Sequence, residues 1–406
     1  MCDTLCGPGR RGMVFAKNSD RPPGEVQITW PFGRRASAGC TLRTQYLSIG
    51  DTGAHAAFLS CPTWLWGAEH GVNEHGVAIG NERISTTHDA TAARPALIGM
   101  DIVRLGLERA RSAPEAVDVM AGLLETYGQG GIADASRQAA YDSSFLIADP
   151  SEAFVLETAG ADYAIAPFPA GVAISNRIAL STEWTRASAG VTAGEDFDRF
   201  RDRTKDTAFA DVRLAASRRF LAATGSGGLT AAATAAHLRD HGTGPWGAPG
   251  TDGPVHAPPA QVGADGSGIS VCLHVRGAVV TTASMIAELP PELADGAPVR
   301  VFVAAGSPCA SIYVPAFPRT AAGPPPFVPR ELSGEDLWHA AAALGRLVED
   351  DPEALPALRE TLEPVEDELW AEADDVLEDP SRWTEVGESW GSRALDALRS
   401  CIPSSP

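Results

Sequence analysis

Short apolar runs, bounded by Gly, Pro or Asn, recur through the first 180 residues and predict β-strands. The runs lie at 12–18, 55–61, 76–82 and 171–176. The stretch 143–158 predicts two further strands, joined by a turn at Asp149-Pro150-Ser151-Glu152.

Helical periodicity appears between these predicted strands. The segment 96–110 places Ile98, Ile102 and Leu105 on one face of a helix. Directly after it, Ser112 and Glu115 match a capping box that opens a second helix, ending near Gly128. The alternation predicts an α+β fold with strand-rich sheets and peripheral helices.

The second half of the chain is less regular. Of the 28 residues in 241–268, 13 are Gly or Pro, which predicts a long loop, either a lid or a disordered insertion. Residues 270–287 predict a hairpin and 299–305 a further strand. A Pro-rich stretch then leads into the C-terminal part. We therefore expect a domain over 2–317 and an acidic helical segment over 332–400.

The charge is concentrated at the C-terminal end. Residues 331–406 hold 20 acidic and 5 basic side chains, a net of -15 out of -20. This argues against nucleic-acid binding, which needs clustered Lys and Arg. The acidic tail predicts a solvated helical appendage, with docking of basic partners as the alternative.

Targeting and redox signals indicate a cytoplasmic protein that does not span a membrane. The chain shows no signal-peptide pattern and no apolar run near 18 residues. Its seven cysteines are scattered without zinc-like CxxC pairs, which predicts reduced thiols rather than a disulfide framework. We expect no metal and no cofactor.

Cys2 is the first candidate for chemistry. Removal of Met1, which requires a small second residue, would leave a thiol and a free α-amine on one residue. The α-amine has a reference pKa of about 7.7–8.0 and the thiol about 8.5, so the amine can take the thiol proton near neutral pH. Taken alone, a cysteine at this position is more often structural.

The segment 12–22 changes that balance. It runs from an apolar strand into a polar corner that holds Lys17 and Asp20, and Lys17 is one of only two lysines in the chain. A second strand beside the first would bring these charges near Cys2. The ammonium would lower the thiol pKa and the carboxylate would orient the α-amine. The alternative is a solvated turn.

The segment 61–85 offers two further candidates. His70, Glu74 and His75 invite a metal site, but the spacing is not HExxH and Gly71 and Gly76 break any helix, so a β-turn between strands is favoured. Asn81, at the end of the following strand, could face a developing oxyanion.

Several long motifs resemble the secernin family, in family order. They are "CDT" (2–4), "FAKNSDRPPGEVQ" (15–27), "PTWLWGAEHGVNEHGVAIGNE" (62–82), "LIGMDIVRLGLERA" (97–110), "YGQGG" (127–131), "SFLIADPSEAFVLETAG" (144–160) and "GSPCASIYVPAF" (306–317). Secernins are similar to cysteine dipeptidases and, more distantly, to penicillin V acylase and bile salt hydrolase. The resemblance implies an N-terminal-nucleophile (Ntn) hydrolase, a four-layer αββα sandwich of two antiparallel sheets, here with a C-terminal helical appendage.

The resemblance also implies roles for individual residues. Cys2 takes the place of the nucleophile, Asp20 that of the residue holding the α-amine, and Lys17 the place of an arginine in the acylases. Asn176 matches the asparagine that donates to the oxyanion, with Asn81 as the second contributor. The late catalytic arginine of the acylases has no clear counterpart.

Residues in the region of that missing arginine, and two tryptophans, are the candidates for substrate binding. His274 and Thr282 lie where the arginine is sought, although a structural role is favoured for each. Trp64 and Trp66 would point to one face of a strand and could line a pocket, although core packing is commoner.

The chain also departs from the family pattern. Cys61 stands where an arginine is expected, which puts contacts to a substrate carboxylate in doubt there. Cys6 is an extra thiol near Cys2, for which a core position is favoured.

Two classes of function follow from the sequence. The first is an amide or peptide hydrolase acting through an acyl-enzyme on a dipeptide or small N-acyl amino compound, with a tailoring hydrolase of a peptidyl natural product as a variant. The second is a non-hydrolytic regulatory or interaction protein, because secernins are implicated in secretion. Homo-oligomerisation stays open. Convergence of Cys2, Lys17, Asp20 and Asn176 in one concave site would favour the enzyme.

Overall fold

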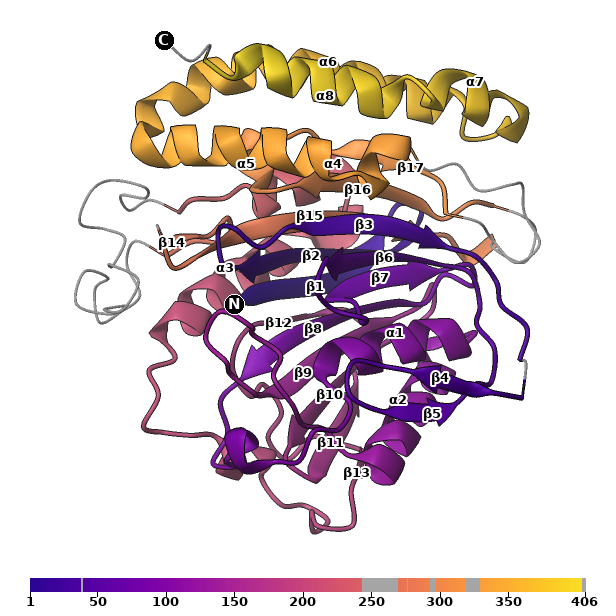
Figure 1. Ribbon diagram of the computed structural model, residues 1–406, viewed down its shortest axis with the longest axis vertical. Helices are drawn as coiled ribbons and strands as arrows, with labels where there is room; N and C mark the ends of the chain where they lie inside the picture. The colour runs from indigo at the N-terminus through magenta and orange to yellow at the C-terminus, as the bar shows by residue number, and fades with distance from the viewer. Residues whose placement is uncertain (38, 243–268, 276, 293–296, 319–328, 404–406) are drawn as a thin grey trace.

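Two antiparallel β-sheets packed face to face form the centre of the molecule (Figure 1). The computed structural model describes residues 1–37, 39–242, 269–275, 277–292, 297–318 and 329–403. The predicted loop 241–268 and the Pro-rich stretch 318–331 therefore fall largely outside the described residues.

The first sheet has seven strands within the described part of the chain. In spatial order they are β12 (Val172–Ile174), β1 (Cys2–Gly9), β2 (Gly12–Arg21), β15 (Val279–Leu289), β16 (Arg300–Ala305) and β17 (Val314–Ala316), with β14 (His274–Val275) paired to β15.

The second sheet has eight strands over the same described residues. In spatial order they are β13 (Arg186–Ala187), β11 (Asp162–Pro167), β10 (Ala153–Ala159), β9 (Asp142–Ala148), β8 (Ala78–Ile84), β7 (His70–Asn73), β6 (Ala57–Pro62) and β3 (Gln27–Phe32). A separate small ribbon is formed by β4 (Thr41–Arg43) and β5 (Ser48–Gly50).

Side-chain alternation along β2 explains why the first sheet is buried on both faces. Met13 and Phe15 enter the core between the two sheets, whereas Val14 and Ala16 enter a second core on the opposite face. Because successive side chains in a strand point to opposite faces, the polar residues that follow divide in the same way. Lys17 therefore points between the sheets and Asp20 away from them.

Two helices cover the outer face of the second sheet: α1 (Gly99–Arg109) and α2 (Ala113–Tyr127). The hydroxyl of Ser112 accepts a hydrogen bond from the backbone N–H of Glu115, as the capping box predicts, while the Glu115 carboxylate accepts one from the N–H of Arg111. Gly99 is the first residue of α1, and a Cβ there would lie 2.4 Å from Ser143 Oγ. The close approach of helix and sheet at this point requires glycine.

Two more helices cover the outer face of the first sheet: α3 (Ala208–Thr224) and α4 (Ala231–Leu238). Leu214 of α3 and Leu238 of α4 share the core with Val14 and Ala16. The layer order is helices, sheet, sheet, helices (Figure 1). The predicted four-layer αββα sandwich of antiparallel sheets is confirmed.

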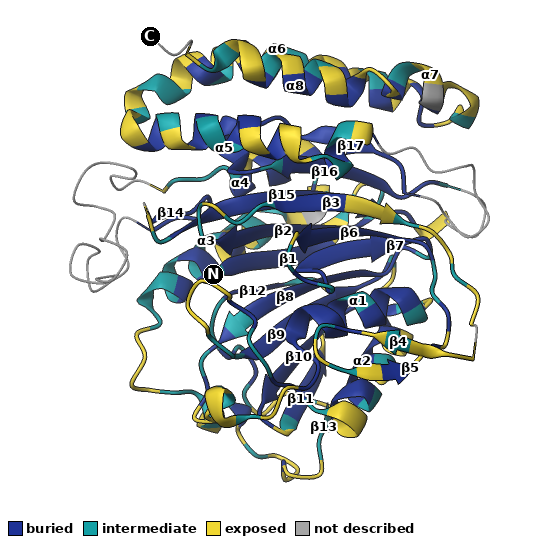
Figure 2. Ribbon diagram, viewed as in Figure 1, coloured by how far each residue is buried: buried dark blue, intermediate teal, exposed yellow. Residues whose placement is uncertain are grey.

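The C-terminal helices cover one end of the sandwich, where β17 and β3 form the edges of their sheets (Figure 1). They are α5 (Glu335–Asp350), α6 (Leu355–Asp375), α7 (Trp383–Gly387) and α8 (Trp390–Cys401). Trp383 and Trp390 are buried against Phe317, and Trp370 packs on Phe302 of β16. Their exposed residues face outward (Figure 2). The predicted acidic helical segment therefore shares its core with the rest of the molecule.

Among the described residues, no helix combines the length and apolar character that a membrane crossing requires.

Candidate active site

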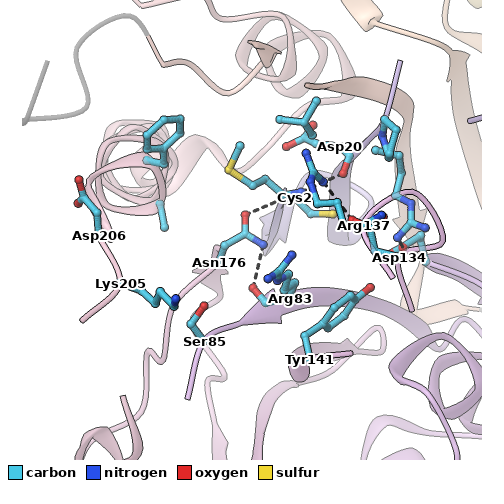
Figure 3. A pocket seen from close by; sticks show the side chains of 17 residues that line it. Cys2, Asp20, Arg83, Ser85, Asp134, Arg137, Tyr141, Asn176, Lys205 and Asp206 are labelled. Carbon is cyan, nitrogen blue, oxygen red and sulfur yellow. Dashed lines mark hydrogen bonds and ion pairs between the residues drawn. The ribbon is translucent and has the colours of Figure 1, made fainter. Parts of the chain in front are cut away.

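A cavity of about 430 Å³ opens beside the start of β1. Its wall mixes acidic, basic and apolar side chains from both sheets and from α3 (Figure 3). The residues that line it are Met1, Cys2, Asp20, Arg21, Pro22, Glu69, Arg83, Ser85, Asp134, Arg137, Tyr141, Asn176, Lys205, Asp206, Phe209, Ala210 and Val279. The candidate nucleophile is thus at the wall of a pocket of ligand size.

Strand pairing fixes Cys2 in this position. Cys2 pairs with Ser19 in the β1–β2 register. The pairing continues one residue further, since the Met1 amine donates to Asp20 O and Asp20 N donates to Met1 O, both at 2.9 Å. The Cys2 thiol lies 4.0 Å from Ser19 Oγ. The backbone atoms of Cys2 are therefore held by the sheet.

Asn176 holds the backbone nitrogen of Cys2 (Figure 3). It follows β12, which pairs with β1 on the side opposite β2. Its Oδ1 accepts a hydrogen bond from Cys2 N at 2.8 Å, and its Nδ2 donates to Arg83 O at 2.9 Å. These partners identify which end of the amide is the oxygen. Asn176 thus presents an acceptor to Cys2 N, while its donor, the group predicted to contact an oxyanion, is bonded to a carbonyl at the cavity wall.

A buried arginine that we did not predict, Arg213, connects the residues around Cys2. It lies on α3, is fully buried, and donates to Asn176 Oδ1 at 2.6 Å, to Asp20 Oδ2 at 3.1 Å and to Cys2 O at 3.3 Å. It also forms an ion pair with Asp3. The sequence does contain a signal for its burial, because Arg213 falls on the same face of α3 as the apolar residues Ala210 and Leu214.

Asp20 is held on two sides. Its Oδ1 accepts a hydrogen bond from Thr281 Oγ1 at 2.7 Å, and its Oδ2 is paired with Arg213. The neighbouring Asp3 shares the same cation. Burial raises the pKa of Asp3 to about 6, against the lowering effect of Arg213 and with a further raising effect from Asp20.

Lys17 lies behind Cys2, between the sheets, and does not line the cavity. Its Nζ donates to Asn81 O at 2.8 Å and forms a fully buried ion pair with Glu82 at 3.1 Å, while Thr4 donates to the same carboxylate. Burial lowers the pKa of Lys17, but Cys2, Glu82 and Glu69 more than offset this, and the net shift is upward. Lys17 is therefore charged.

The Cys2 thiol is protonated while Met1 is present. Burial raises the pKa of Cys2 to about 12, although the Lys17 ammonium acts in the opposite direction. The lysine thus has the electrostatic effect that the sequence predicts, but it is smaller than the effect of burial.

Asn81 is not brought to the cavity. Its side chain points to the α1 face of the second sheet, where Nδ2 contacts Met100 Sδ at 3.3 Å, and its backbone N–H donates to Glu69 O. The reason is the two-residue period of β8, because Glu82 faces Cys2's strand and Asn81 must then face away.

The four candidate substrate-binding residues lie outside the cavity. Thr282 donates to Ser19 O at 3.1 Å and Gln27 Oε1 at 2.9 Å, and His274 is buried in a cluster of its own. Trp64 and Trp66 lie in a turn after β6 and not in a strand, so they do not share a face. They pack in two separate apolar clusters, and Arg104 lies over the Trp66 ring at 4.2 Å.

The turn predicted at "VNEHG" is present between β7 and β8, with Gly76 at φ +74°. The metal site that His70, Glu74 and His75 invite was not favoured, and in the structure His70 is buried while Glu74 and His75 lie with His55. Glu74 bonds to Arg34 at 2.7 Å, and His75 Nε2 lies 3.1 Å from His55 Nδ1. Cys6 and Cys61 are buried, and neither lines the cavity.

Replacing Glu82 with glutamine is expected to remove a pH-dependent part of the stability. Burial raises the pKa of Glu82 to about 7, against Lys17. A folded pKa above the ordinary value of 4.5 for a glutamate stabilises the fold at low pH, and this contribution is lost as the pH rises through about 7. We expect the free energy of unfolding of wild type, relative to E82Q, to fall by on the order of 2 kcal/mol between about pH 5 and 8 in urea titrations. The exposed Glu335→Gln serves as control, and a constant difference would contradict the argument.

One part of the chain matches a known protein family. Residues 61–196 match the model of peptidase family C69. The predicted resemblance is confirmed over this part, which runs from the end of β6 through β13 and includes the cavity residues Arg83, Tyr141 and Asn176.

The chain is also similar to two solved structures. Penicillin V acylase from Agrobacterium tumefaciens is 12% identical, with 78% of this chain and 84% of that chain covered and a TM-score of 0.44. The C2A mutant of conjugated bile acid hydrolase from Clostridium perfringens is 10% identical, with 74% and 88% covered and a TM-score of 0.42.

Proposed function

We propose that this protein is a cysteine-type amide hydrolase that cleaves small peptides, with Cys2 as nucleophile once Met1 is removed. The observation that carries the proposal is the hydrogen bond from Cys2 N to Asn176 Oδ1 at the wall of a cavity. When Met1 is removed, that nitrogen becomes an α-amine beside its own thiol. Its acceptor is already in place.

The chemistry then needs no histidine. The α-amine takes the thiol proton, and the sulfur attacks the amide carbon to give a tetrahedral intermediate. The C–N bond breaks as the ammonium returns the proton to the leaving amine. Water, deprotonated by the same amine, hydrolyses the thioester and frees the thiol. Loss of Met1 also exposes the thiol to the cavity, which reduces the burial that raises its pKa.

Arg213 positions the reacting residue, and Asp20 holds Arg213. The arginine holds Asn176 Oδ1 and Cys2 O at the same time, so it fixes the orientation of the amide that accepts from the amine. Lys17 supplies positive charge behind the thiol. The Asn176 Nδ2 group lies at the cavity wall and is the predicted oxyanion donor, for which it would exchange its contact with Arg83 O.

The cavity favours a substrate with a free carboxylate, such as a dipeptide. Arg83 lines it, and within the described part of the chain no acidic side chain forms an ion pair with its guanidinium, which lies 5.4 Å from the Tyr141 ring centroid. In contrast, Arg21 is paired with Glu69 and Arg137 with Asp134. Arg83 is thus a cation suited to a carboxylate.

Replacing Arg83 with leucine is expected to raise KM for dipeptides about 10-fold or more, with little change in kcat, because a charge-assisted contact to the substrate is lost. Dipeptide C-terminal amides should show no such change. Arg137→Leu, at the same cavity but already paired, is the matched control. If Arg83→Leu raises KM equally for dipeptides and for their C-terminal amides, Arg83 does not bind the substrate carboxylate.

The proposed function is tested by intact mass and by trapping. The purified protein should lack Met1, and it should hydrolyse members of a panel of dipeptides and N-acyl amino acids. A peptide chloromethyl ketone should then label Cys2, and competing dipeptide should slow the labelling. A protein that is active with Met1 retained, or that is labelled elsewhere, would overturn the proposal.

The arrangement does not favour the non-hydrolytic interaction protein, since Cys2, Asp20 and Asn176 meet in one concave site with Lys17 behind them. We also propose a cytoplasmic location. All seven cysteines are described and none forms a disulfide, which suits a reducing compartment and a reduced nucleophile.

A further inference from the structure

Two cysteines and two histidines meet at a point separate from the Cys2 cavity. They are Cys272, His274, Cys309 and His241, and none of them lines that cavity. His274 belongs to β14, Cys309 to the 3-10 helix η5 (Pro308–Ala310), and His241 follows α4. One ligand atom from each residue lies within 4.8 Å of every other. Three chain segments therefore bring two thiol and two imidazole donors together.

The spacing of these atoms matches a tetrahedral zinc site. His274 Nε2 lies 3.4 Å from Cys272 Sγ and 3.3 Å from Cys309 Sγ. Zn–S bonds of about 2.3 Å and Zn–N bonds of about 2.0–2.1 Å at a tetrahedral angle place sulfur and nitrogen ~3.6 Å apart. The sulfur and nitrogen atoms are thus close to ligand separation.

The histidine orientation supports the same assignment. His274 Nδ1 lies 2.9 Å from Glu349 Oε1 of α5, and Nε2 faces the two sulfurs. A carboxylate on the far nitrogen of a ligating histidine is the usual supporting contact in zinc sites, because it fixes the ring and raises ligand basicity. His274, Cys272 and Cys309 are buried.

We propose that His241, Cys272, His274 and Cys309 bind one structural zinc ion. Thiolate and imidazole donors in a four-ligand set suit zinc. All four positions are filled by protein, and three of the ligands are buried, so the ion holds structure and does not bind substrate. This site departs from the sequence-based expectation of no metal, which rested on the absence of CxxC pairs and of an HExxH spacing.

Through these ligands the ion would join separate layers. His241 follows α4 on the outer face of the first sheet, His274 belongs to that sheet, and Glu349 belongs to the C-terminal α5. Zinc binding would therefore stabilise the packing of the C-terminal helices, because binding to the folded chain alone adds to folding free energy.

Metal content tests the site. The full chain, purified through a histidine-free tag after growth with zinc and dialysed against metal-free buffer, should hold about one zinc per chain by mass spectrometry. Cys309→Ala and His274→Ala should lower this about 10-fold or more, while the buried Cys61→Ala should not. Zinc that is absent from wild type, or equal in wild type and Cys309→Ala, would overturn the proposal.

A second measurement needs no variant. Wild type stripped with a chelator should melt at a lower temperature, regain its melting temperature with Zn²⁺, and with Co²⁺ show a thiolate-to-metal charge-transfer band of a tetrahedral site. A Cys272–Cys309 disulfide, seen as two thiols that resist alkylation in the unreduced unfolded chain, would overturn the proposal. Because dipeptide hydrolysis is scored separately, this outcome does not depend on the proposed function.

Discussion

Replacing Cys2 with alanine should lower kcat/KM for dipeptide hydrolysis by at least ~10³-fold, because the reaction loses the atom that forms the acyl-enzyme. The fold should survive. Alanine fits the β1 position, and the pairing of β1 with β2 uses only backbone atoms. Initial rates on the best dipeptide, together with the urea midpoint, check both parts.

Two related variants sharpen this result. Cys2→Ser keeps a nucleophilic oxygen next to the same amine, so it should retain more activity than Cys2→Ala. Cys6→Ala is the matched control, since Cys6 lies on the same strand, is fully buried and does not line the cavity. It should remain within about 2-fold of wild type. Full activity in Cys2→Ala would exclude Cys2 as nucleophile.

Replacing Arg213 with methionine should destabilise the fold by about 3–5 kcal/mol and abolish measurable activity. The change leaves the buried carboxylates of Asp3 and Asp20 without their shared cation, which is the costly way to break a buried ion pair. It also frees the amide of Asn176 that orients the Cys2 amine. Urea unfolding followed by circular dichroism measures the first effect, and dipeptide hydrolysis the second.

The control for Arg213 lies on the same helix. Arg218 is exposed, so Arg218→Met should change stability by less than ~0.5 kcal/mol. Adding Asp3→Asn to Arg213→Met should recover part of the lost stability, because one of the two unpaired charges is removed. A double variant no more stable than the single one would show that the loss comes from packing and not from charge.

The sequence was sufficient for elements whose pattern is local. The strand expected at 12–18 is part of β2, the helix expected at 96–110 contains α1, and the turn at 149–152 joins β9 to β10. These elements have a clear period of 2 or 3.6, or carry turn and capping residues. The order of strands in the sheets could not be obtained in this way, because β2 pairs with β15 across more than half of the chain.

The sequence identified site residues only where they lie in a motif near Cys2 or in a motif that resembles the secernin family. Cys2, Asp20 and Asn176 do line the cavity, as predicted. Asn81 does not, because strand alternation turns its side chain to the opposite face. Arg213 was missed because its role depends on α3 covering the first sheet, and one buried charge on a helix face does not identify its partners.

The zinc ligands illustrate the limit more strongly. His241, Cys272 and Cys309 are far apart in the sequence and follow no metal-binding spacing. Only the packing of β14, η5 and the segment after α4 brings them together. His274 was considered as a substrate residue, although its contacts place it with the two cysteines.

The C-terminal helices determine what the two sheets expose. β17 and β3 are edge strands, and an uncovered edge offers unpaired backbone groups to a second chain. Because α5 and α8 lie over this end and Trp383 and Trp390 cover Phe317, a chain shortened before these helices would present both sheet edges and an apolar patch around Phe317. The same segment carries most of the net negative charge, which opposes self-association. We therefore expect the acidic C-terminal helices to limit aggregation of the folded chain.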